Sequence, residues 1–324
     1  MRAVVVTPAE PGSLSGNRVT AERWAKRLIE LGHDVRIQTE WDGAPADLLI
    51  ALHARKSHAS IQRFDDRLPG TPIVVVLTGT DLYVDLVDPV DLDGDAKVRD
   101  SLARARLLVA LQRLAANKLP AELRDRVRVI HQAAEAATHH PVVAEDSFDV
   151  CVLAHLRPVK DPLLAARAAR QLPVASKVRV LHAGQALDAS LAATARSEMD
   201  ANARYQWLGL LERSEASQLL ASSRALVLCS RSEGGANVVS EALACGIPVL
   251  STRIDGSVGL LGEDYPGFFE VGDATGLAKQ LQRIEQDEEF LTDLRKRCNQ
   301  LAPSFTQEAE RAAWAALLQE LALD

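Results

Sequence analysis

Residues 225–253, ALVLCSRSEGGANVVSEALACGIPVLSTR, combine two short apolar runs with a glycine-rich loop and a helical pattern. The runs Ala225–Ser230 and Ile247–Ser251 have the apolar character of buried strands in a parallel sheet. A helix is predicted between them, starting at Asn237 and ending at Gly246, because its apolar positions repeat at helical spacing and glycine often terminates helices. The stretch therefore predicts a strand, loop, helix and strand of an α/β fold.

The loop before this helix has the features of a phosphate site. Gly234 and Gly235 let the backbone approach a ligand, and the N–H groups of the first helical turn attract an anion together with the helix dipole. Glu233 lies in the loop and Glu241 in the helix, so both carboxylates can face a ligand at the helix start. Carboxylates beside a phosphate are expected to accept hydrogen bonds from sugar or ribose hydroxyls. A glycine-rich loop by itself is equally compatible with a purely structural connection.

Strand and helix patterns alternate outward from this stretch in both directions, which indicates parallel, doubly wound sheets. The further predicted strands are Arg2–Thr7, Asp34–Thr39, Asp47–Leu52, Pro72–Leu77, Leu107–Leu111, Val127–His131, Phe148–Ala154, Val178–Ala183, Tyr205–Leu208 and Phe268–Val271. Helices are predicted at Arg18–Leu31, His58–Leu68 and Gln307–Leu323, and a short glycine-rich loop is predicted after Asp255 and Gly256. Ligands of such sheets bind at the carboxyl ends of the strands.

Length and composition favour two ordinary globular domains. The chain has 324 residues, of which 47% are hydrophobic, and this length exceeds that of a typical single domain. A linker with paired histidines is predicted at residues 132–147. We expect domains at residues 1–145 and 146–305, followed by a closing segment at residues 306–324.

Charge and hydropathy exclude several classes of partner. The net charge of −7 argues against an electrostatic nucleic-acid binder. No apolar segment approaches the length of a membrane span, and Met1 leads directly into a strand pattern rather than a signal peptide. We therefore expect a cytoplasmic protein with neither nucleic acid nor membrane as a partner. The four cysteines lack metal-ligand spacing and are expected to be buried thiols.

Polar residues follow several of the predicted strands, three of them in the first half of the chain. In the first half, the loop that leads to Gly16 is a second phosphate-type loop, but its glycine spacing does not match the dinucleotide fingerprint, so an NAD enzyme is disfavoured. His53, Arg55 and Lys56 follow another strand and form either an anion pocket or a solvated turn. The turn Thr78–Tyr83 follows a third strand, and its small residues permit a ligand to approach.

In the second half, Arg157 and Lys160 lie three positions apart after a strand, within LeuArgProValLysAspPro. A basic pair at a helix start is often merely exposed to solvent. If the strand end directs both side chains toward a ligand, arginine as a fork and lysine as a point charge can bind a diphosphate.

Glu233, seven residues, Glu241 and then AlaCysGlyIleProVal resemble the donor-site motif of the retaining family 4 glycosyltransferases. This resemblance implies the GT-B architecture, which has two Rossmann-like domains facing across a cleft and a C-terminal helix crossing back to the first domain. It implies a leaving-group clamp of Arg157 and Lys160, with Glu233 as a third catalytic residue. The implied donor-binding residues are Gly16, Arg157, Lys160, Glu233, Gly235, Ala236, Asn237, Val238 and Glu241. No cofactor is expected and the UDP-sugar is a substrate; no metal is expected, because two cations and a helix start can balance the diphosphate charge.

Within this family, HisLeuArgProValLysAspPro, LeuThrGlyThrAspLeuTyr and the N-terminal ThrProAlaGluProGlySerLeuSerGlyAsnArg are similar to the selenosugar synthases of selenoneine biosynthesis. The resemblance implies UDP-N-acetylglucosamine as donor and selenophosphate as acceptor. A histidine often occupies the position of Thr78 in the family, and an anionic selenium nucleophile would not need such a base. The expected acceptor-binding residues are Asn17, Arg18, Arg55, Lys56, Thr78, Gly79 and Asp81.

Three alternatives remain open at this point. An ordinary family 4 transferase would use a carbohydrate or small alcohol as acceptor. A nucleotide-sugar sensor would bind the donor without transfer. The presence of both acidic residues, Glu233 and Glu241, and of both basic residues, Arg157 and Lys160, argues against an active site that has lost its function. A nucleotide-sugar epimerase of the same architecture would need no acceptor.

Overall fold

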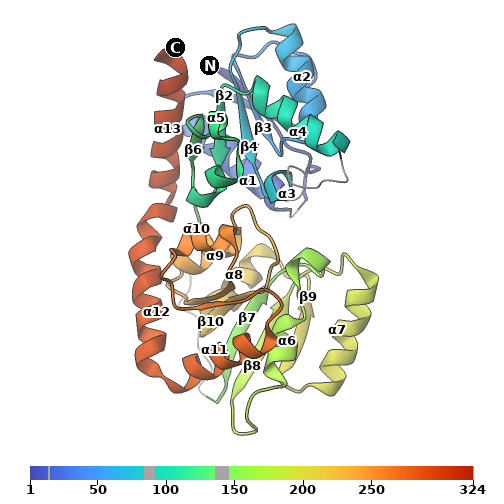
Figure 1. Ribbon diagram of the computed structural model, residues 1–324, viewed down its shortest axis with the longest axis vertical. Helices are drawn as coiled ribbons and strands as arrows, with labels where there is room; N and C mark the ends of the chain where they lie inside the picture. Colours follow the sequence, from blue (N-terminus) through green and yellow to red (C-terminus); the bar gives the residue numbers. More distant parts are fainter. Residues whose placement is uncertain (14, 84–91, 136–145, 324) are drawn as a thin grey trace. The chain divides into compact units, whose positions relative to one another are not determined.

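The computed structural model describes residues 1–13, 15–83, 92–135 and 146–323, and it contains two six-stranded parallel sheets (Figure 1). The strand orders are β2-β1-β3-β4-β5-β6 and β12-β11-β10-β7-β8-β9, and every paired strand is parallel to its neighbour. Helices connect the strands in both sheets, so the predicted fold class of two Rossmann-like α/β domains is confirmed.

The first sheet and its helices come from the N-terminal part of the chain and from the last helix. The strands are β1 (Arg2–Val6), β2 (Asp34–Gln38), β3 (Leu48–Leu52), β4 (Ile73–Leu77), β5 (Leu107–Ala110) and β6 (Val127–Val129). The helices are α1 (Gly16–Glu30), α2 (His58–Arg67), α3 (Thr80–Tyr83), α4 (Leu92–Arg104), the 3₁₀ helix η1 (Arg113–Lys118), α5 (Ala121–Arg124) and α13 (Gln307–Leu323).

The second sheet and its helices come from the rest of the chain. The strands are β7 (Phe148–Leu153), β8 (Val178–Ala183), β9 (Tyr205–Gly209), β10 (Ala225–Leu228), β11 (Val249–Thr252) and β12 (Phe268–Phe269). The helices are η2 (Pro158–Lys160), α6 (Leu164–Ala169), α7 (Ala189–Ala201), α8 (Arg213–Ser222), α9 (Asn237–Ala244), α10 (Asp255–Leu261), α11 (Ala274–Gln286), α12 (Glu288–Leu301) and η3 (Ala302–Phe305).

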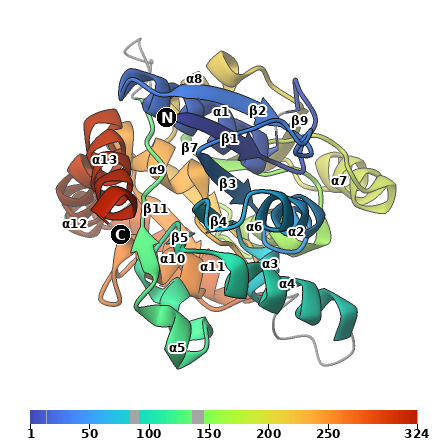
Figure 2. The same ribbon diagram turned by 90° about the horizontal axis from the view of Figure 1, so that it is seen from above.

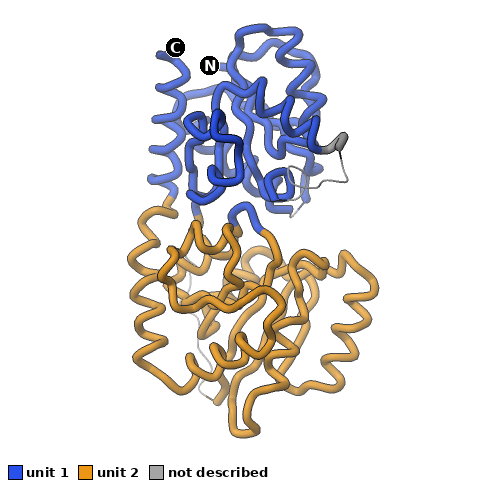
Figure 3. The backbone as a smooth tube through the Cα atoms, in the orientation of Figure 1, with its two compact units in different colours: residues 1–133, 233–235, 307–324 blue, residues 134–232, 236–306 orange. Residues whose placement is uncertain are grey.

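The chain divides into two compact units (Figure 3). Unit 1 contains residues 1–133, 233–235 and 307–324, and unit 2 contains residues 134–232 and 236–306. The boundary predicted at residue 145 and the paired histidines of the predicted linker fall in residues 136–145, which lie outside the described part of the chain.

In unit 1, alternate strand residues pack on opposite faces of the sheet, as the two-residue period of a strand requires. One face carries α2 and α4, which lie side by side (Figure 2), with Phe64 and Leu102 in its core. The other face carries α1 and α13, whose Trp24 and Trp314 meet edge to face with ring centroids 5.0 Å apart. Because both faces are covered, the central strand β4 reads as the continuous apolar run IVVVL.

Two predicted loops are helical. The segment after Ile254 forms α10, with Gly256 and Gly259 both buried. Glycine lowers intrinsic helix propensity, but tertiary packing of this buried segment overrides it. Likewise, the turn predicted at Thr78–Tyr83 contains the one-turn helix α3, whose residue Asp81 is fully buried.

Candidate functional site

The strand order of unit 2 places a topological switch point between β7 and β10. The chain passes from β7 outward through β8 and β9, and then returns to form β10 on the opposite side of β7. The two connections therefore leave the carboxyl ends of β7 and β10 in opposite directions. Open α/β sheets bind ligands at such a switch point. The loop after β7 carries Arg157 and Lys160, and the loop after β10 leads to α9.

These two loops are bonded to each other. The backbone N–H of Arg231 donates to the carbonyl of Val159 at 2.8 Å, and Arg231 Nη2 donates to Asp161 Oδ2 at 3.0 Å. Arg167 Nη2 donates to the other carboxylate oxygen of Asp161 at 2.9 Å. Asp161 is buried and has a φ of 38°, a left-handed conformation that costs most residues energy but that aspartate tolerates. The loop after β7 is thus fixed against the loop after β10.

Sequence reasoning did not single out Asp161, Arg167 or Arg231. Their significance lies in a bond between residues seventy positions apart, Asp161 and Arg231. No local pattern reveals such a pair. The only local indication was the position of Asp161 immediately after the basic pair.

The predicted clamp residues Arg157 and Lys160 lie in this fixed loop. Arg157 is exposed and extended, and it precedes the 3₁₀ helix η2, which ends at the half-buried Lys160. Burial lowers the pKa of the neighbouring His155, and the positive charges of Lys160 and Arg157 lower it further. The backbone N–H of Gln185 donates to His155 Nδ1 at 3.0 Å, which leaves the proton of the neutral ring on Nε2. The loop thus carries two cations, Arg157 and Lys160, and a neutral donor, Nε2 of His155.

The helix α9 begins at Asn237, as predicted, after Ala236 in the N-cap position. Alanine offers no side-chain acceptor for the first-turn N–H groups, and the structure shows no side-chain cap there. An anion can take that place, as at other helix starts. Val238 and Glu241 are both half-buried, and Glu241 lies in the second turn of α9.

Residues 233–235, which include the predicted Glu233 and Gly235, belong to unit 1 by their contacts (Figure 3). A Cβ atom built on Gly79 would lie 2.9 Å from the backbone nitrogen of Gly234, and one built on Gly235 would lie 2.5 Å from Cβ of Leu111. Gly79 also has a φ of 138°, which side chains rarely adopt. Glycine at position 79 therefore lets the loop after β4 approach the backbone of Gly234, and glycine at position 235 leaves room for Leu111.

The first sheet has its own switch point, between β1 and β3. After β1, Ser15 caps α1 by accepting the N–H of Arg18 at 3.4 Å, and the predicted residues Gly16 and Asn17 form the start of this helix. Arg18 Nε donates to Glu22 at 2.6 Å, so its charge is already balanced within α1. Gly16 is exposed, and Asn17 is half-buried.

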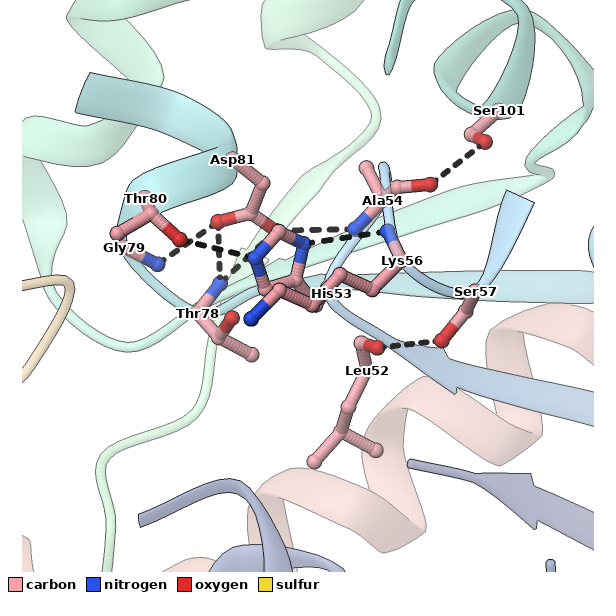
Figure 4. Close-up of polar contacts among 10 residues, drawn as sticks. All are labelled: Leu52, His53, Ala54, Lys56, Ser57, Thr78, Gly79, Thr80, Asp81 and Ser101. Carbon is pink, nitrogen blue, oxygen red and sulfur yellow. Dashed lines mark hydrogen bonds and ion pairs between the residues drawn. The ribbon is translucent and has the colours of Figure 1, made fainter. Parts of the chain in front are cut away.

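The loops after β3 and β4 meet around a buried carboxylate (Figure 4). Asp81 accepts the backbone N–H groups of Ala54 at 3.0 Å, Thr78 at 3.0 Å and Gly79 at 2.8 Å. With so many backbone donors, this fully buried carboxylate organises the loops around it. Thr78 is half-buried beside it. The structure thus brings together the predicted residues Thr78, Gly79 and Asp81.

His53 lies in the same cluster, directly after β3, with a φ of 71°. Its Nε2 is 2.9 Å from Oγ1 of Thr80, and its Nδ1 is 3.4 Å from the backbone nitrogen of Lys56 (Figure 4). Arg55 is half-buried and Lys56 is exposed, so the loop that carries both cations is neither wholly buried nor wholly solvated.

Within residues 1–13, 15–83, 92–135 and 146–323, no helix is long and apolar enough to span a bilayer. The same residues contain no group of three or more His, Cys, Asp or Glu side chains arranged to hold a metal ion. The four cysteines are free thiols and all but Cys245 are buried; burial raises the pKa of Cys151 and of Cys229 to about 12.

Comparison with known sequences gives three matches. The pattern of the family described as glycosyl transferases group 1 matches residues 135–304, just over half of the chain. A stretch of 98 residues is 34% identical to the N-acetyl-alpha-D-glucosaminyl L-malate synthase of Bacillus anthracis, covering 30% of this chain and 25% of that protein. A stretch of 101 residues is 34% identical to the lipopolysaccharide core biosynthesis glycosyltransferase LpsE of Rhizobium meliloti, covering 31% of this chain and 30% of that protein. The matched stretches span less than a third of either relative.

Solved structures resemble the chain over nearly its whole length. Anabaena HepE in complex with UDP and glucose superposes with a TM-score of 0.76 at 16% identity, covering 99% of this chain and 100% of that one. The sucrose-phosphate synthase of Thermosynechococcus elongatus superposes with a TM-score of 0.81 at 14% identity, covering 99% of this chain and 98% of that one. At these identities the likeness establishes the shared fold, which is that of the GT-B glycosyltransferases.

Proposed function

Because the chain belongs to the glycosyl transferases group 1 family, we propose that it transfers a sugar, chiefly N-acetylglucosamine, from a UDP-sugar to the selenium of selenophosphate. The observation that carries the donor half of this proposal is the paired loops at the β7–β10 switch point. They place Arg157, Lys160 and the start of α9 in one unit. Such a group suits a diphosphate better than a neutral ligand.

Names among the similar proteins support the choice of donor. The Anabaena structure holds UDP, and the Bacillus anthracis relative is named for an N-acetylglucosaminyl product. We assign donor binding to residues 146–305 and acceptor binding to residues 1–145. Glu233 and Glu241 are assigned to hydroxyl groups of the sugar or ribose, since a carboxylate is an acceptor of hydrogen bonds only.

The proposed transfer exchanges one bond at the anomeric carbon for another. The bond from C1 to the β-phosphate oxygen breaks, and its electron pair leaves with UDP. A selenium lone pair of selenophosphate forms the new C1–Se bond, giving a sugar selenophosphate. Water then cleaves the Se–P bond, which releases phosphate and the 1-selenosugar. Arg157, Lys160 and the N–H groups of residues 236–238 stabilise the charge that grows on UDP as it departs.

The acceptor half rests on charge and on the sequence resemblance. Selenophosphate is already an anionic nucleophile, so it needs cations to bind it and no base to deprotonate it. Arg55 and Lys56 follow β3 at the switch point of unit 1 and supply such cations. Arg18 is a third cation proposed for this role, and its Nε also donates to Glu22 within α1. Thr78 then contributes to the shape of the site without transferring a proton.

The proposal also specifies that transfer needs no metal ion. The clamp side chains and the start of α9 supply the counter-charge that a divalent cation supplies in other nucleotide enzymes. Release of UDP should therefore proceed at the same rate after treatment with EDTA. A rate that collapses in EDTA and returns with added Mg²⁺ would contradict this part of the proposal.

A panel of acceptors tests the function as a whole. Purified protein is given UDP-N-acetylglucosamine with selenophosphate, thiophosphate, L-malate, a free sugar or no acceptor, and UDP release is measured. We expect the fastest release with selenophosphate. Release with the free sugar but not with selenophosphate would favour the alternative suggested by the match to LpsE, a transferase with a carbohydrate acceptor. Tight UDP binding without release under any condition would favour a sensor, and an isomerised UDP-sugar would favour an epimerase.

A further inference from the structure

The hydrogen bonds of His53 fix the position of its proton. The residue is 2% exposed, and its Nδ1 lies 3.4 Å from the backbone nitrogen of Lys56 (Figure 4). A backbone N–H can only donate, so Nδ1 accepts and carries no proton. The ring proton of the neutral imidazole is therefore on Nε2.

This tautomer determines how the hydroxyl of Thr80 is used. His53 Nε2 lies 2.9 Å from Oγ1 of Thr80, and with the proton on Nε2 the ring donates to the hydroxyl oxygen. A hydroxyl has one proton to donate, and here that proton cannot be directed at the ring. Thr80 is exposed and lies at the start of α3, three residues after the end of β4, so its O–H is available to a ligand.

Asp81 holds the two loops at the spacing that this arrangement needs. Its carboxylate accepts N–H groups from Ala54, in the loop after β3, and from Gly79, in the loop after β4. His53 takes a left-handed backbone conformation with a φ of 71°, which is uncommon for residues other than glycine and marks a constrained position.

We infer that the hydroxyl of Thr80 donates a hydrogen bond to an anionic oxygen of the acceptor, and that His53 is the positioning residue that orients this hydroxyl. The inference rests on the proposed function in taking the carboxyl edge of the first sheet as the acceptor site. It adds the chemical class that this site selects, an oxyanion such as a phosphate-type or carboxylate group. A donor aimed at an ionised oxygen forms a stronger bond than one aimed at a neutral hydroxyl. Arg55 and Lys56, on the loop of His53, add charge of the matching sign.

Two substitutions at Thr80 separate the hydroxyl from the shape of the side chain. Thr80→Val keeps the branched shape and removes the hydroxyl, whereas Thr80→Ser keeps the hydroxyl. We expect Thr80→Val to raise the KM for selenophosphate about tenfold or more, as loss of a hydrogen bond to a charged group does. Thr80→Ser should stay within about threefold of wild type, and the Kd for UDP should not change in either variant. A folded Thr80→Val protein with an unchanged acceptor KM would overturn the inference.

The role of His53 is tested through Thr80. Asparagine tolerates the left-handed backbone conformation, so His53→Asn removes the long reach of Nε2 with little backbone penalty. We expect this variant to raise the acceptor KM with an unchanged Kd for UDP. In the double variant His53→Asn/Thr80→Val, the KM should rise less than the product of the two single effects, because the effect of His53 on the acceptor passes through the Thr80 hydroxyl. A double variant whose acceptor KM equals the product of the two single effects would contradict the positioning role of His53.

The choice of acceptor separates this inference from the proposed function. The variants are assayed with selenophosphate and with L-malate, the latter as a carboxylate oxyanion. A Thr80-dependent KM for malate with no turnover of selenophosphate would reject the proposed function and support the inference. Turnover of selenophosphate with a KM that Thr80→Val leaves unchanged would support the proposed function and reject the inference.

Discussion

The carboxylate of Asp161 is bonded to the guanidinium of Arg231, with 3.0 Å between Oδ2 and Nη2, across seventy residues of sequence. The same carboxylate also accepts a hydrogen bond from Arg167 at 2.9 Å. Asp161 directly follows Lys160, and Arg231 lies in the loop between β10 and α9. This pair therefore sets the spacing between the two loops of the proposed donor site.

Neutralising this carboxylate should weaken donor binding. Asp161→Asn keeps a residue that tolerates the φ of 38° but removes the charge that two arginines share. We expect a KM for the UDP-sugar about tenfold higher, because the loop that carries Arg157 and Lys160 loses its anchor, whereas the KM for the acceptor should not change. Asp161→Gly, which relieves any backbone strain, should show the same defect. A normal donor KM in both variants would show that the pair is only structural.

The clamp itself is tested by removing its charges. We expect Arg157→Ala and Lys160→Ala each to lower kcat by a factor of about 10² to 10³, as the loss of one preorganised electrostatic donor does. Arg170→Ala is the matched control. This exposed arginine lies at the end of α6 in unit 2 and is paired with Glu198 of α7. Its loss should change kcat less than about threefold. Clamp variants that keep kcat within a few-fold of wild type would place these side chains outside the reaction.

The attachment of the last helix is expected to depend on Glu310. Its buried Oε1 accepts from Arg23 Nε at 2.9 Å, from Trp24 Nε1 at 2.7 Å and from the backbone N–H of Ala133 at 3.0 Å. Glu310→Ala should lower the free energy of unfolding by about 3 kcal/mol, because it removes a buried negative charge beside Arg23 and the acceptor of the N–H groups of Trp24 and Ala133. The exposed Glu308 of the same helix is the control, and Glu308→Ala should cost less than about 0.5 kcal/mol. Unfolding in urea measures the stability of both variants, and equal unfolding midpoints for Glu310→Ala and Glu308→Ala would contradict the role of Glu310.

The stability of the fold should fall between pH 7 and pH 5 because of His182. This histidine is fully buried between the hydroxyl of Tyr205 and the carbonyl of Ala154, each 2.8 Å from a ring nitrogen, and burial lowers its pKa to about 4. Below the ordinary histidine pKa, His182 binds a proton in the unfolded chain but stays neutral in the folded chain. The free energy of unfolding therefore decreases as the pH falls toward 4. For this one group the loss from pH 7 to pH 5 amounts to about 2 kcal/mol.

Burial also lowers the pKa of His33, His131 and His155, so these residues act in the same direction. The comparison with His182→Gln isolates the contribution of His182, since the variant keeps the other three. Unfolding in urea at the two pH values should show a smaller difference for the variant. An equal difference for both proteins would contradict the assignment.

Much of the fold follows from local patterns, because strands that are buried on both faces are continuous apolar runs. The run IVVVL, the start of α9 at Asn237 and the bounds of α13 are visible in the sequence alone. The helix α10 was missed because its stability comes from burial of Gly256 and Gly259 and not from helix propensity.

The hydrogen bonds and ion pairs of the two sites could not be predicted from local sequence patterns either. Thr80 was passed over because its use depends on the tautomer of His53, and that tautomer depends on a backbone N–H of Lys56. The ion pair of Asp161 with Arg231 joins segments whose proximity appears only once the strand order is known.

Mass spectrometry of the reaction products tests the central claim most directly. Purified protein is incubated with UDP-N-acetylglucosamine and selenophosphate, and the products are examined for the isotope pattern of selenium. We predict a compound that contains N-acetylglucosamine and one selenium atom, formed together with UDP and strongly reduced with Arg157→Ala. A reaction in which another acceptor is glycosylated while no sugar–selenium compound forms would contradict the account.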